Sequence, residues 1–235
     1  MFTAFSYTLA GRKRNLSARP TNEDRVLVRS FNADQGGPAI LIAVSDGVSR
    51  CADGGAVAQW LVHDRLGNDD FLTNGEPDLR RSVETYLKGV HQDFLDQFDG
   101  NVDMMESAAT LAGVVVRNGK ACVFWSGDSP IYLLRKREGK LEGKTLSSPD
   151  KIHGTPMLTD CFSGVTAFAF RMVALQVHPG DFLICATDGL VPEAEELAES
   201  LSDTPFSRAW AENICTYSYN FPGSDDIGVA AVRID

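Results

Sequence analysis

The sequence predicts an α+β fold in which two packed, mostly antiparallel β-sheets form a central sandwich flanked by pairs of helices. Strand-like segments come in consecutive runs and helical segments come in pairs. Such grouping favours antiparallel pairing over a doubly wound parallel sheet, in which strands and helices alternate. An apolar strand followed by Asp-Gly and then two helices also occurs twice, starting near residues 39 and 182. This repeat predicts a pseudo-symmetric sandwich with both Asp-Gly corners at one edge.

The predicted strands are short segments rich in Val, Ile, Leu and Phe, which fit the pleated surface of a sheet. They lie at about residues 3–9, 25–30, 39–45, 109–116, 121–126, 130–135, 171–177, 182–186 and 227–233. Residues 136–170 are interrupted by Pro and Gly and show no long periodic run. This segment is therefore predicted to be a surface loop or flap.

Helical segments are predicted at about residues 54–66, 77–98, 192–201 and 205–219. The second is the clearest, because apolar residues recur every three or four positions along one face. These residues are Leu79, Val83, Leu87, Val90, Phe94 and Phe98. Pro77 suits the first turn of this helix, and Thr204 is the expected N-cap of the last one.

Length and composition predict one globular domain over residues 1–235. The chain is 43% hydrophobic and 23% charged, and it is long enough to bury a sizeable core. No apolar run approaches the roughly 20 residues of a membrane helix, and the first residues lack the order of a signal peptide. We therefore expect a cytoplasmic protein with no membrane partner. The five cysteines form no CxxC pair, which favours reduced thiols over disulfides or a zinc site.

The chain is acidic, with a formal net charge of −10 and a pI near 4.9. This balance argues against nucleic acid as a partner, because phosphate backbones normally bind basic surfaces. A small anionic substrate would require a local source of positive charge.

Acidic residues recur at the ends of the predicted strands. Any single Asp beside Gly or Ser is typical of a turn, but several carboxylates gathered at one edge would repel one another unless they were protonated or neutralised. An all-oxygen cluster suits a hard divalent cation, Mg²⁺ or Mn²⁺, rather than zinc. The candidates are Glu23, Asp24, Asp46, Asp128, Asp188 and Asp225.

Motifs of several other phosphate-handling enzymes are absent from the sequence. It contains no GxxxxGK[ST] loop, and none of its cysteines is followed six residues later by Arg, as a cysteine-nucleophile phosphatase requires. The first apolar strand ends in Ser-Asp-Gly, not in an Asp-x-Asp nucleophile pair. The sequence therefore argues against a P-loop nucleotide-binding enzyme, a cysteine-nucleophile phosphatase and an aspartate-nucleophile phosphatase.

Six fragments resemble, in order, the motifs of the metal-dependent PPM (type 2C) Ser/Thr protein phosphatases. They are ARPTNEDRVLV, VSDG, SAATLAGVVV with VFWSGDSPIYLLR, LTDCFSG, HPGDFLICATDGL and SDDIGVAAVRI. The resemblance runs from about residue 19 to residue 234. It implies the PPM-type fold, a β-sandwich between helix pairs, which agrees with the fold class predicted above.

The resemblance also implies a set of metal ligands. Asp46 resembles the aspartate that bridges two Mg²⁺ or Mn²⁺ ions, and the carbonyl of Gly47 is expected to bind one of them. Asp188 and Asp225 resemble ligands of the other ion. The Asp-Asp-Ile-Gly sequence leaves Asp226 as an alternative to Asp225, although the register of the final strand favours Asp225.

Three further residues complete the site that the resemblance implies. Glu23 and Asp24 match an acidic pair that holds metal-bound water. Arg19 matches a phosphate-binding arginine, and in an extended segment, which Pro20 favours, positions 19 and 23 share a face. The guanidinium of Arg19 could then hold a phosphate bidentately. The implied mechanism is in-line attack by a water that bridges the two metals, without a phosphoenzyme.

The chain also departs from the family pattern. Val48, Ser49 and Arg50 follow the first Asp-Gly where many relatives have His or Met and two glycines, so no histidine is available there as a general acid. Asp128 matches an aspartate often tied to a third metal, but Pro130 and Pro192 replace residues usually found near that site. A third ion at Asp128 therefore stays an open alternative.

The sequence thus predicts a Mg²⁺- or Mn²⁺-dependent hydrolase that acts on phosphoserine and phosphothreonine in proteins and opposes a Ser/Thr kinase. The main alternative is a catalytically idle PPM-like domain that binds phosphoproteins or regulates a partner, which the departures motivate. A weaker alternative is hydrolysis of small phosphate esters.

Overall fold

The computed structural model describes residues 1–12, 21–33, 37–68 and 78–235. Two five-stranded sheets form its centre, and every strand pair in this part of the chain is antiparallel. The first sheet has the order β1 (Phe2–Leu9), β12 (Ile227–Ile234), β11 (Phe182–Ala186), β7 (Ile131–Arg137) and β8 (Lys140–Thr145). The second has the order β10 (Arg171–Gln176), β6 (Lys120–Ser126), β5 (Leu111–Arg117), β3 (Gly37–Asp46) and β2 (Asp24–Ala33). A short pair joins β4 (Ala108–Ala109) to β9 (Phe162–Ser163).

The core between the two sheets follows from the two-residue period of their strands. Along β3, Ile40 and Ile42 point into the core that the sheets share. Leu41 and Ala43 point the other way, into the core beneath the first helices. Side chains of alternate residues lie on opposite faces of a strand, so β3 is buried on both faces. This burial explains why the strand is continuously apolar up to the acidic residue at its end.

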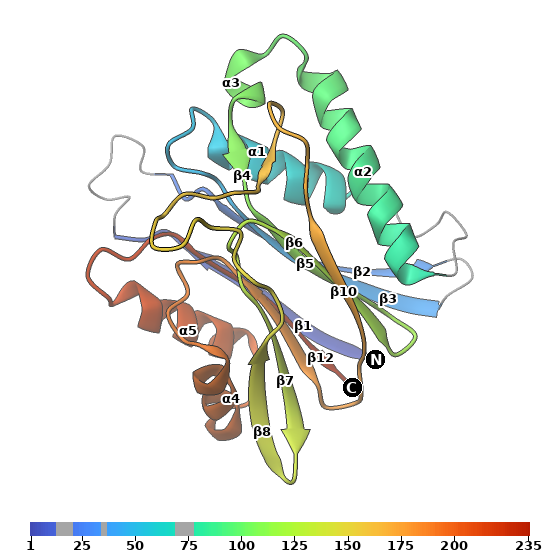
Figure 1. Ribbon diagram of the computed structural model, residues 1–235. Helices are drawn as coiled ribbons and strands as arrows, with labels where there is room; N and C mark the ends of the chain where they lie inside the picture. The colour runs from blue at the N-terminus through green and yellow to red at the C-terminus, as the bar shows by residue number, and fades with distance from the viewer. Residues whose placement is uncertain (13–20, 34–36, 69–77) are drawn as a thin grey trace.

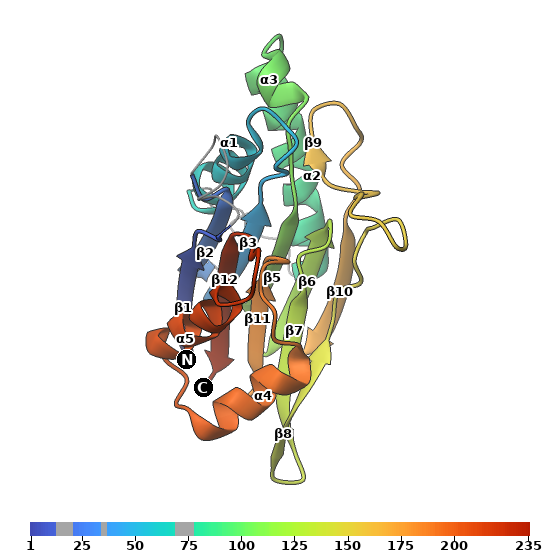
Figure 2. The ribbon, with the colours of Figure 1, turned by 90° about the vertical axis from the view of Figure 1, so that its left-hand side faces the viewer.

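Helices cover the outer faces of the sandwich (Figures 1 and 2). The second sheet is covered by α1 (Gly54–Gln59), by the π-helix η2 (Trp60–Leu66) that continues it, and by α2 (Leu79–Phe98). The first sheet is covered by α4 (Ala194–Asp203) and α5 (Arg208–Tyr219). The one-turn helix α3 (Val102–Met105) follows α2. The predicted fold class, an antiparallel sandwich flanked by helix pairs, is confirmed.

The last helix begins later than the sequence predicts. Ser207, not Thr204, is its N-cap, because the Ser207 side chain accepts a hydrogen bond from the Trp210 N–H at 3.3 Å. Thr204 instead ends α4, and its N–H donates to the Ser200 carbonyl at 3.0 Å. The expectation that Thr204 caps the last helix was therefore wrong, because Thr204 is still engaged by the preceding helix.

Residues 136–170, predicted as a loop or flap, include β8 and β9. The β8 segment, KLEGKT, has one large apolar residue, Leu141, and reads as polar. Within the described part of the chain it pairs with β7 alone and forms the edge of its sheet. Charged side chains are common on edge strands, where they oppose pairing with other chains. An edge strand of this kind therefore cannot be recognised from its composition.

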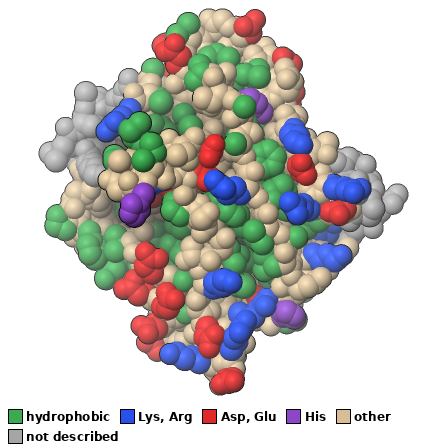
Figure 3. All heavy atoms as spheres, in the orientation of Figure 1, with side chains coloured by type: hydrophobic (Ala, Val, Ile, Leu, Met, Phe, Trp, Pro, Cys, Tyr) green, Lys and Arg blue, Asp and Glu red, His purple; other side chains and the backbone are tan. Residues whose placement is uncertain are grey.

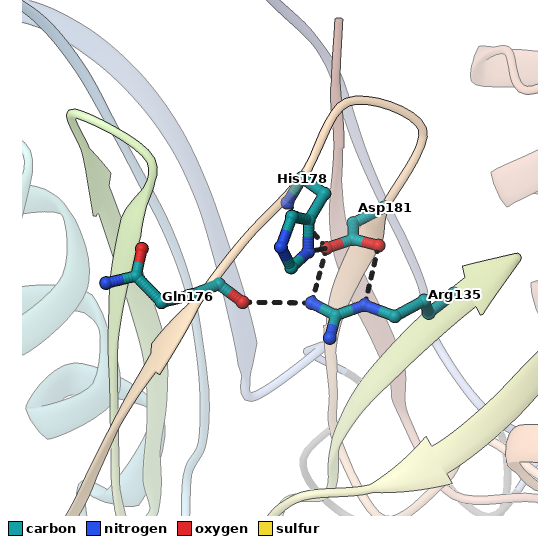
Figure 4. Close-up of polar contacts among 4 residues, drawn as sticks. All are labelled: Arg135, Gln176, His178 and Asp181. Carbon is teal, nitrogen blue, oxygen red and sulfur yellow. Dashed lines mark hydrogen bonds and ion pairs between the residues drawn. The ribbon is translucent and has the colours of Figure 1, made fainter.

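A buried carboxylate joins β7 to the turn between β10 and β11 (Figure 4). The Arg135 guanidinium donates to both oxygens of Asp181, at 2.9 and 2.7 Å, and to the Gln176 carbonyl at 2.9 Å. The N–H of His178 donates to the same carboxylate at 2.8 Å. Asp181 is 2% exposed, so this pairing fixes the return of the chain into β11, the strand that leads to the second Asp-Gly corner.

Charges of both signs share the face shown in Figure 3. Acidic side chains gather over α4, whose first turn carries Glu195 and Glu196, and basic ones lie over the neighbouring β7–β8 hairpin. No helix among the described residues is both long and apolar enough to cross a membrane.

Candidate active site

Each of the two Asp-Gly corners needs glycine because another part of the backbone passes close by. A Cβ on Gly47 would lie 2.4 Å from the carbonyl carbon of Gly54, in the first turn of α1. A Cβ on Gly189 would lie 1.9 Å from the carbonyl oxygen of Asp226. Neither glycine has a positive φ. The two corners are thus close-packing points rather than left-handed turns.

Asp24 and Asp46 lie side by side at the edge of the second sheet. They are directly opposite each other in the β2–β3 register. Asp24 is 2% exposed, and its Oδ1 atom is buried without a hydrogen-bond partner among the described residues. Two adjacent carboxyl groups with an unsatisfied oxygen are costly unless a proton or a cation joins them.

Thr187 links this pair to the first sheet. Its hydroxyl donates to Oδ2 of Asp24 at 2.6 Å and accepts from the Gly228 N–H at 2.8 Å. Because the Gly228 N–H occupies a lone pair of the hydroxyl, the hydroxyl proton is directed at the carboxylate. Thr187, which precedes the second Asp-Gly corner, therefore holds Asp24 of the second sheet in place.

The environment strongly favours the neutral forms of both acids. Burial, opposed by the Thr187 hydrogen bond and assisted by the charge of Asp226, raises the pKa of Asp24 to about 8. Burial also raises the pKa of Asp46 well above its usual value, as do the charges of Asp24 and Asp188. The site therefore favours a positive charge among these carboxylates.

Asp188 and Asp225 lie close enough to Asp46 to act on it electrostatically. Burial and the neighbouring Asp128 raise the pKa of Asp188, although its side chain is 39% exposed at the rim of the site, and Lys151 lowers that pKa. Asp225 raises the pKa of both Asp46 and Asp188. These three carboxylates therefore share one electrostatic environment.

Asp226 has a different role from Asp225. Its two oxygens accept the N–H groups of Gly11, at 2.9 Å, and Glu23, at 2.8 Å. It is 2% exposed. Both oxygens are thus engaged by backbone donors, although the charge of Asp226 still acts on Asp24. Asp225 instead acts on Asp46 and Asp188, and the acids at this edge, Asp24, Asp46, Asp128, Asp188 and Asp225, are called the acidic cluster below.

Glu23 lies against the first Asp-Gly corner. Its carbonyl accepts the Gly47 N–H at 3.3 Å, and its side chain is so near α1 that a Cβ on Gly55 would lie 3.0 Å from its Cγ. Glu23 is 5% exposed. The two glycines at the start of α1 therefore make room for this acid and for the corner itself.

The Gly127–Ser129 loop is tied to the same corner through Thr110. The Thr110 hydroxyl accepts the Asp46 N–H at 3.0 Å and bonds the Ser129 hydroxyl at 2.7 Å. Gly127 has a φ of +104°, which other residues rarely adopt. This conformation turns the chain so that Asp128 joins the cluster, where it pairs with Lys151.

No three acidic, histidine or cysteine side chains in the described ranges are grouped tightly enough to hold an ion as they stand. Mutual repulsion among carboxylates opposes such grouping. The acids share an edge of the sandwich and an electrostatic environment, but they do not form a closed coordination shell.

A comparison with family models identifies the family of the chain. The family model for protein phosphatase 2C matches residues 13–220. The chain belongs to this family. Membership confirms the predicted family and the predicted class of enzyme, a metal-dependent protein phosphatase that hydrolyses phosphate monoesters.

Solved structures of bacterial phosphatases share the protein phosphatase 2C fold with this chain. PppA, "a key regulatory component of T6SS in Pseudomonas aeruginosa", is 25% identical with a TM-score of 0.73, over 99% of this chain and 97% of its own. The catalytic domain of the serine threonine protein phosphatase PstP, in complex with two manganese ions, is 20% identical with a TM-score of 0.77, over 100% and 99%. The S. agalactiae serine/threonine phosphatase is 17% identical with a TM-score of 0.78, over 100% of both chains. No curated protein sequence matches the chain.

Most of the predicted site residues of this protein phosphatase lie at one edge of the sandwich. These are Glu23, Asp24, Asp46, Gly47, Asp128, Asp188 and Asp225. Arg19 lies outside the described residues. Sequence reasoning missed Thr187, Thr110 and Lys151 as partners of the acids. The position of Thr187 at the end of an apolar strand was a usable signal, whereas nothing in the sequence marked Lys151.

Proposed function

We propose that this protein phosphatase removes phosphate from phosphoserine and phosphothreonine in proteins with the help of two bound Mg²⁺ or Mn²⁺ ions. The observation that carries the proposal is the buried pair Asp24 and Asp46, with Asp188 and Asp225 close enough to raise the pKa of Asp46. Burying several acids whose ionisation is suppressed destabilises the folded protein. Bound cations that neutralise these acids would explain why the fold keeps them together.

The donor set fits hard divalent cations. All the candidate donors are oxygens, as Mg²⁺ and Mn²⁺ prefer, and the buried Oδ1 of Asp24 has no protein donor among the described residues. We assign Asp46, the Gly47 carbonyl, Asp188 and Asp225 as metal ligands. Glu23 and Asp24 would act through water. The two manganese ions of PstP support the number of bound ions by analogy of fold.

Bound ions would activate a water molecule as the nucleophile and neutralise the phosphoryl oxygens. The residues of the chain would position the acids that hold these ions. Thr187 holds Asp24 from the first sheet, and Thr110 holds the backbone of Asp46 and the loop of Asp128. Arg19 is proposed to grip the phosphate, because its guanidinium offers a charged, bidentate donor in an otherwise acidic protein.

No feature of the site among the described residues favours the idle alternative. The departures from the family pattern fall at residues 48–50, 130 and 192, whereas the acids proposed as ligands of the two ions are all present. Hydrolysis of small phosphate esters is compatible with the same chemistry and is separated from protein dephosphorylation only by the choice of substrate. We therefore retain phosphoproteins, the products of a Ser/Thr kinase, as the substrates. A role in cytoplasmic signalling is part of the same proposal.

The deciding experiment measures phosphate release from a phosphothreonine peptide and from an aryl phosphate, after removal of metal and after addition of Mn²⁺. We expect turnover of both that depends on Mn²⁺, and loss of that turnover in Asp46→Asn. Asp64→Asn, which removes an exposed carboxylate from η2, is the matched control and should behave as wild type. Absence of Mn²⁺-dependent turnover on both substrates would contradict the proposal, and activity on the aryl phosphate alone would support small esters instead.

A further inference from the structure

The Lys151 ammonium lies between two carboxylates of the acidic cluster. It forms an ion pair with Oδ2 of Asp128 and lies 3.4 Å from Oδ2 of Asp188. The Asp128 side chain is 6% exposed and that of Lys151 is 31% exposed. The lysine therefore enters the cluster from its solvent side and leaves Oδ1 of Asp188 to other partners.

A pair of hydrogen bonds holds Lys151 opposite Asp128. The Asp150 N–H donates to the Gly127 carbonyl at 2.9 Å, and the Gly127 N–H donates to Oδ2 of Asp150 at 3.2 Å. Asp150 and Gly127 are the residues immediately before Lys151 and Asp128, so this two-bond clasp aligns the pair that follows.

Buried side chains support the clasp. Asp150 is 3% exposed, and its second oxygen accepts from Nε of Arg171 on β10 at 2.6 Å. On the other side, Lys151 forms a backbone bridge with Leu158. These contacts fix the backbone of Lys151 from its own loop and from the second sheet, and the ion pairs with Asp128 and Asp188 then position the ammonium.

We propose that the Lys151 ammonium is a tethered cation that takes the place of a third divalent ion between Asp128 and Asp188. A divalent ion at Asp128 would have to displace the ammonium or lie beside a like charge, and either arrangement weakens its binding. Lysine suits the role because its charge is compact and carries three donors. The inference rests on the proposed two-metal function and deepens it: the protein holds two ions and supplies the third positive charge itself.

Metal stoichiometry tests this proposal independently of activity. The full chain is stripped with a chelator and titrated with Mn²⁺ by calorimetry, and bound metal is then measured by elemental analysis after dialysis. We expect two Mn²⁺ per wild-type chain and three in Lys151→Met, in which Asp128 is released. Adding Asp128→Asn to Lys151→Met should return the count to two. Lys151→Arg, which keeps the charge, should also bind two, as should the control Lys140→Met at the exposed end of the β7–β8 hairpin.

The outcomes separate this inference from the function on which it rests. A wild-type chain that binds three Mn²⁺ would overturn the tethered cation and leave the phosphatase proposal standing. The same conclusion follows if a folded Lys151→Met binds only two ions. A wild-type chain that binds no Mn²⁺ would refute the two-metal site and this inference together. Thermal unfolding checks the fold of each variant, and Lys151→Gln, which keeps a polar end group, replaces Lys151→Met if that variant does not fold.

Discussion

Asp24→Asn should stabilise the metal-free protein, and the gain should grow with pH. The folded protein raises the pKa of this buried carboxyl from 3.8 to about 8. Between these two values the folded chain holds a proton that the unfolded chain has released. Stability linked to Asp24 therefore falls as pH rises from about 4 to about 8. An asparagine carries no such penalty, and its amide can donate to Asp46 as the protonated acid would.

The size of the effect follows from the same shift. One pKa unit corresponds to about 1.4 kcal/mol, which sets an upper limit of about 6 kcal/mol above pH 8. Water entry and relaxation around a buried charge reduce such penalties, so we expect a gain of about 2 to 6 kcal/mol at pH 8.5. The difference between variant and wild type should shrink to near zero at pH 4.

Urea unfolding in chelator buffer at several pH values from 4.5 to 8.5 measures this difference. Wild type should lose stability relative to Asp24→Asn by up to about 1.4 kcal/mol per pH unit across this window. Asp64→Asn, which removes an exposed carboxylate, should run parallel to wild type. With added Mn²⁺, wild type should become more stable than Asp24→Asn. An ion that binds only the folded state stabilises the protein that binds it more tightly, and we expect that protein to be wild type. Parallel pH profiles for Asp24→Asn and wild type would refute the reasoning.

The other predictions concern the first Asp-Gly corner, a proposed metal ligand, the Thr187 hydroxyl and the proposed phosphate-binding arginine. Gly47→Ala should cost about 1 to 3 kcal/mol of unfolding free energy through overpacking against α1, measurable by denaturation, and an unchanged midpoint would refute the close-packing role. Asp188→Asn should abolish activity and weaken Mn²⁺ binding in calorimetry while the fold is kept; unchanged binding would exclude it as a ligand. Thr187→Val, which removes one donor and leaves one buried N–H unsatisfied, should cost about 2 to 5 kcal/mol, whereas a loss under about 0.5 kcal/mol would contradict its linking role. Arg19→Ala should lower kcat/KM by roughly 10- to 1,000-fold at saturating Mn²⁺ with partial recovery in Arg19→Lys, and wild-type kinetics in Arg19→Ala would contradict phosphate binding.

The sequence predicted those parts of the fold whose signal is local. The helix at residues 79–98 was predicted because its apolar period continues for over five turns, and the central strands because their apolar runs are buried on both faces. Elements whose identity depends on a neighbour were missed. The β8 strand is polar and exists because β7 lies beside it, and Ser207 became the N-cap because α4 still held Thr204.

The same distinction applies to the site. Acids at strand ends could be found in sequence, because an ionisable residue that ends an apolar run is conspicuous. Thr187 is also conspicuous at the end of an apolar strand, but which acid each partner contacts could not be predicted, since Thr187 is 163 residues from Asp24, and Lys151 is 37 residues from Asp188. Only the packed sandwich brings them together. The register of the final strand already favoured Asp225 over Asp226, and the backbone donors that engage Asp226 add a second reason for the same preference.

The position of the site at the edge of the sandwich makes its geometry depend on how the two sheets pack. Asp24 and Asp46 belong to the second sheet, whereas Thr187 and Asp188 follow a strand of the first. Hydrogen bonds between the sheets set the separation, from Thr187 to Asp24 and from Glu23 to Asp226. A shift of one sheet against the other would therefore change the spacing of the carboxylates before it exposed the apolar core. The repulsion among the acids opposes this packing, so neutralising them should tighten the same contacts that hold the sheets in register.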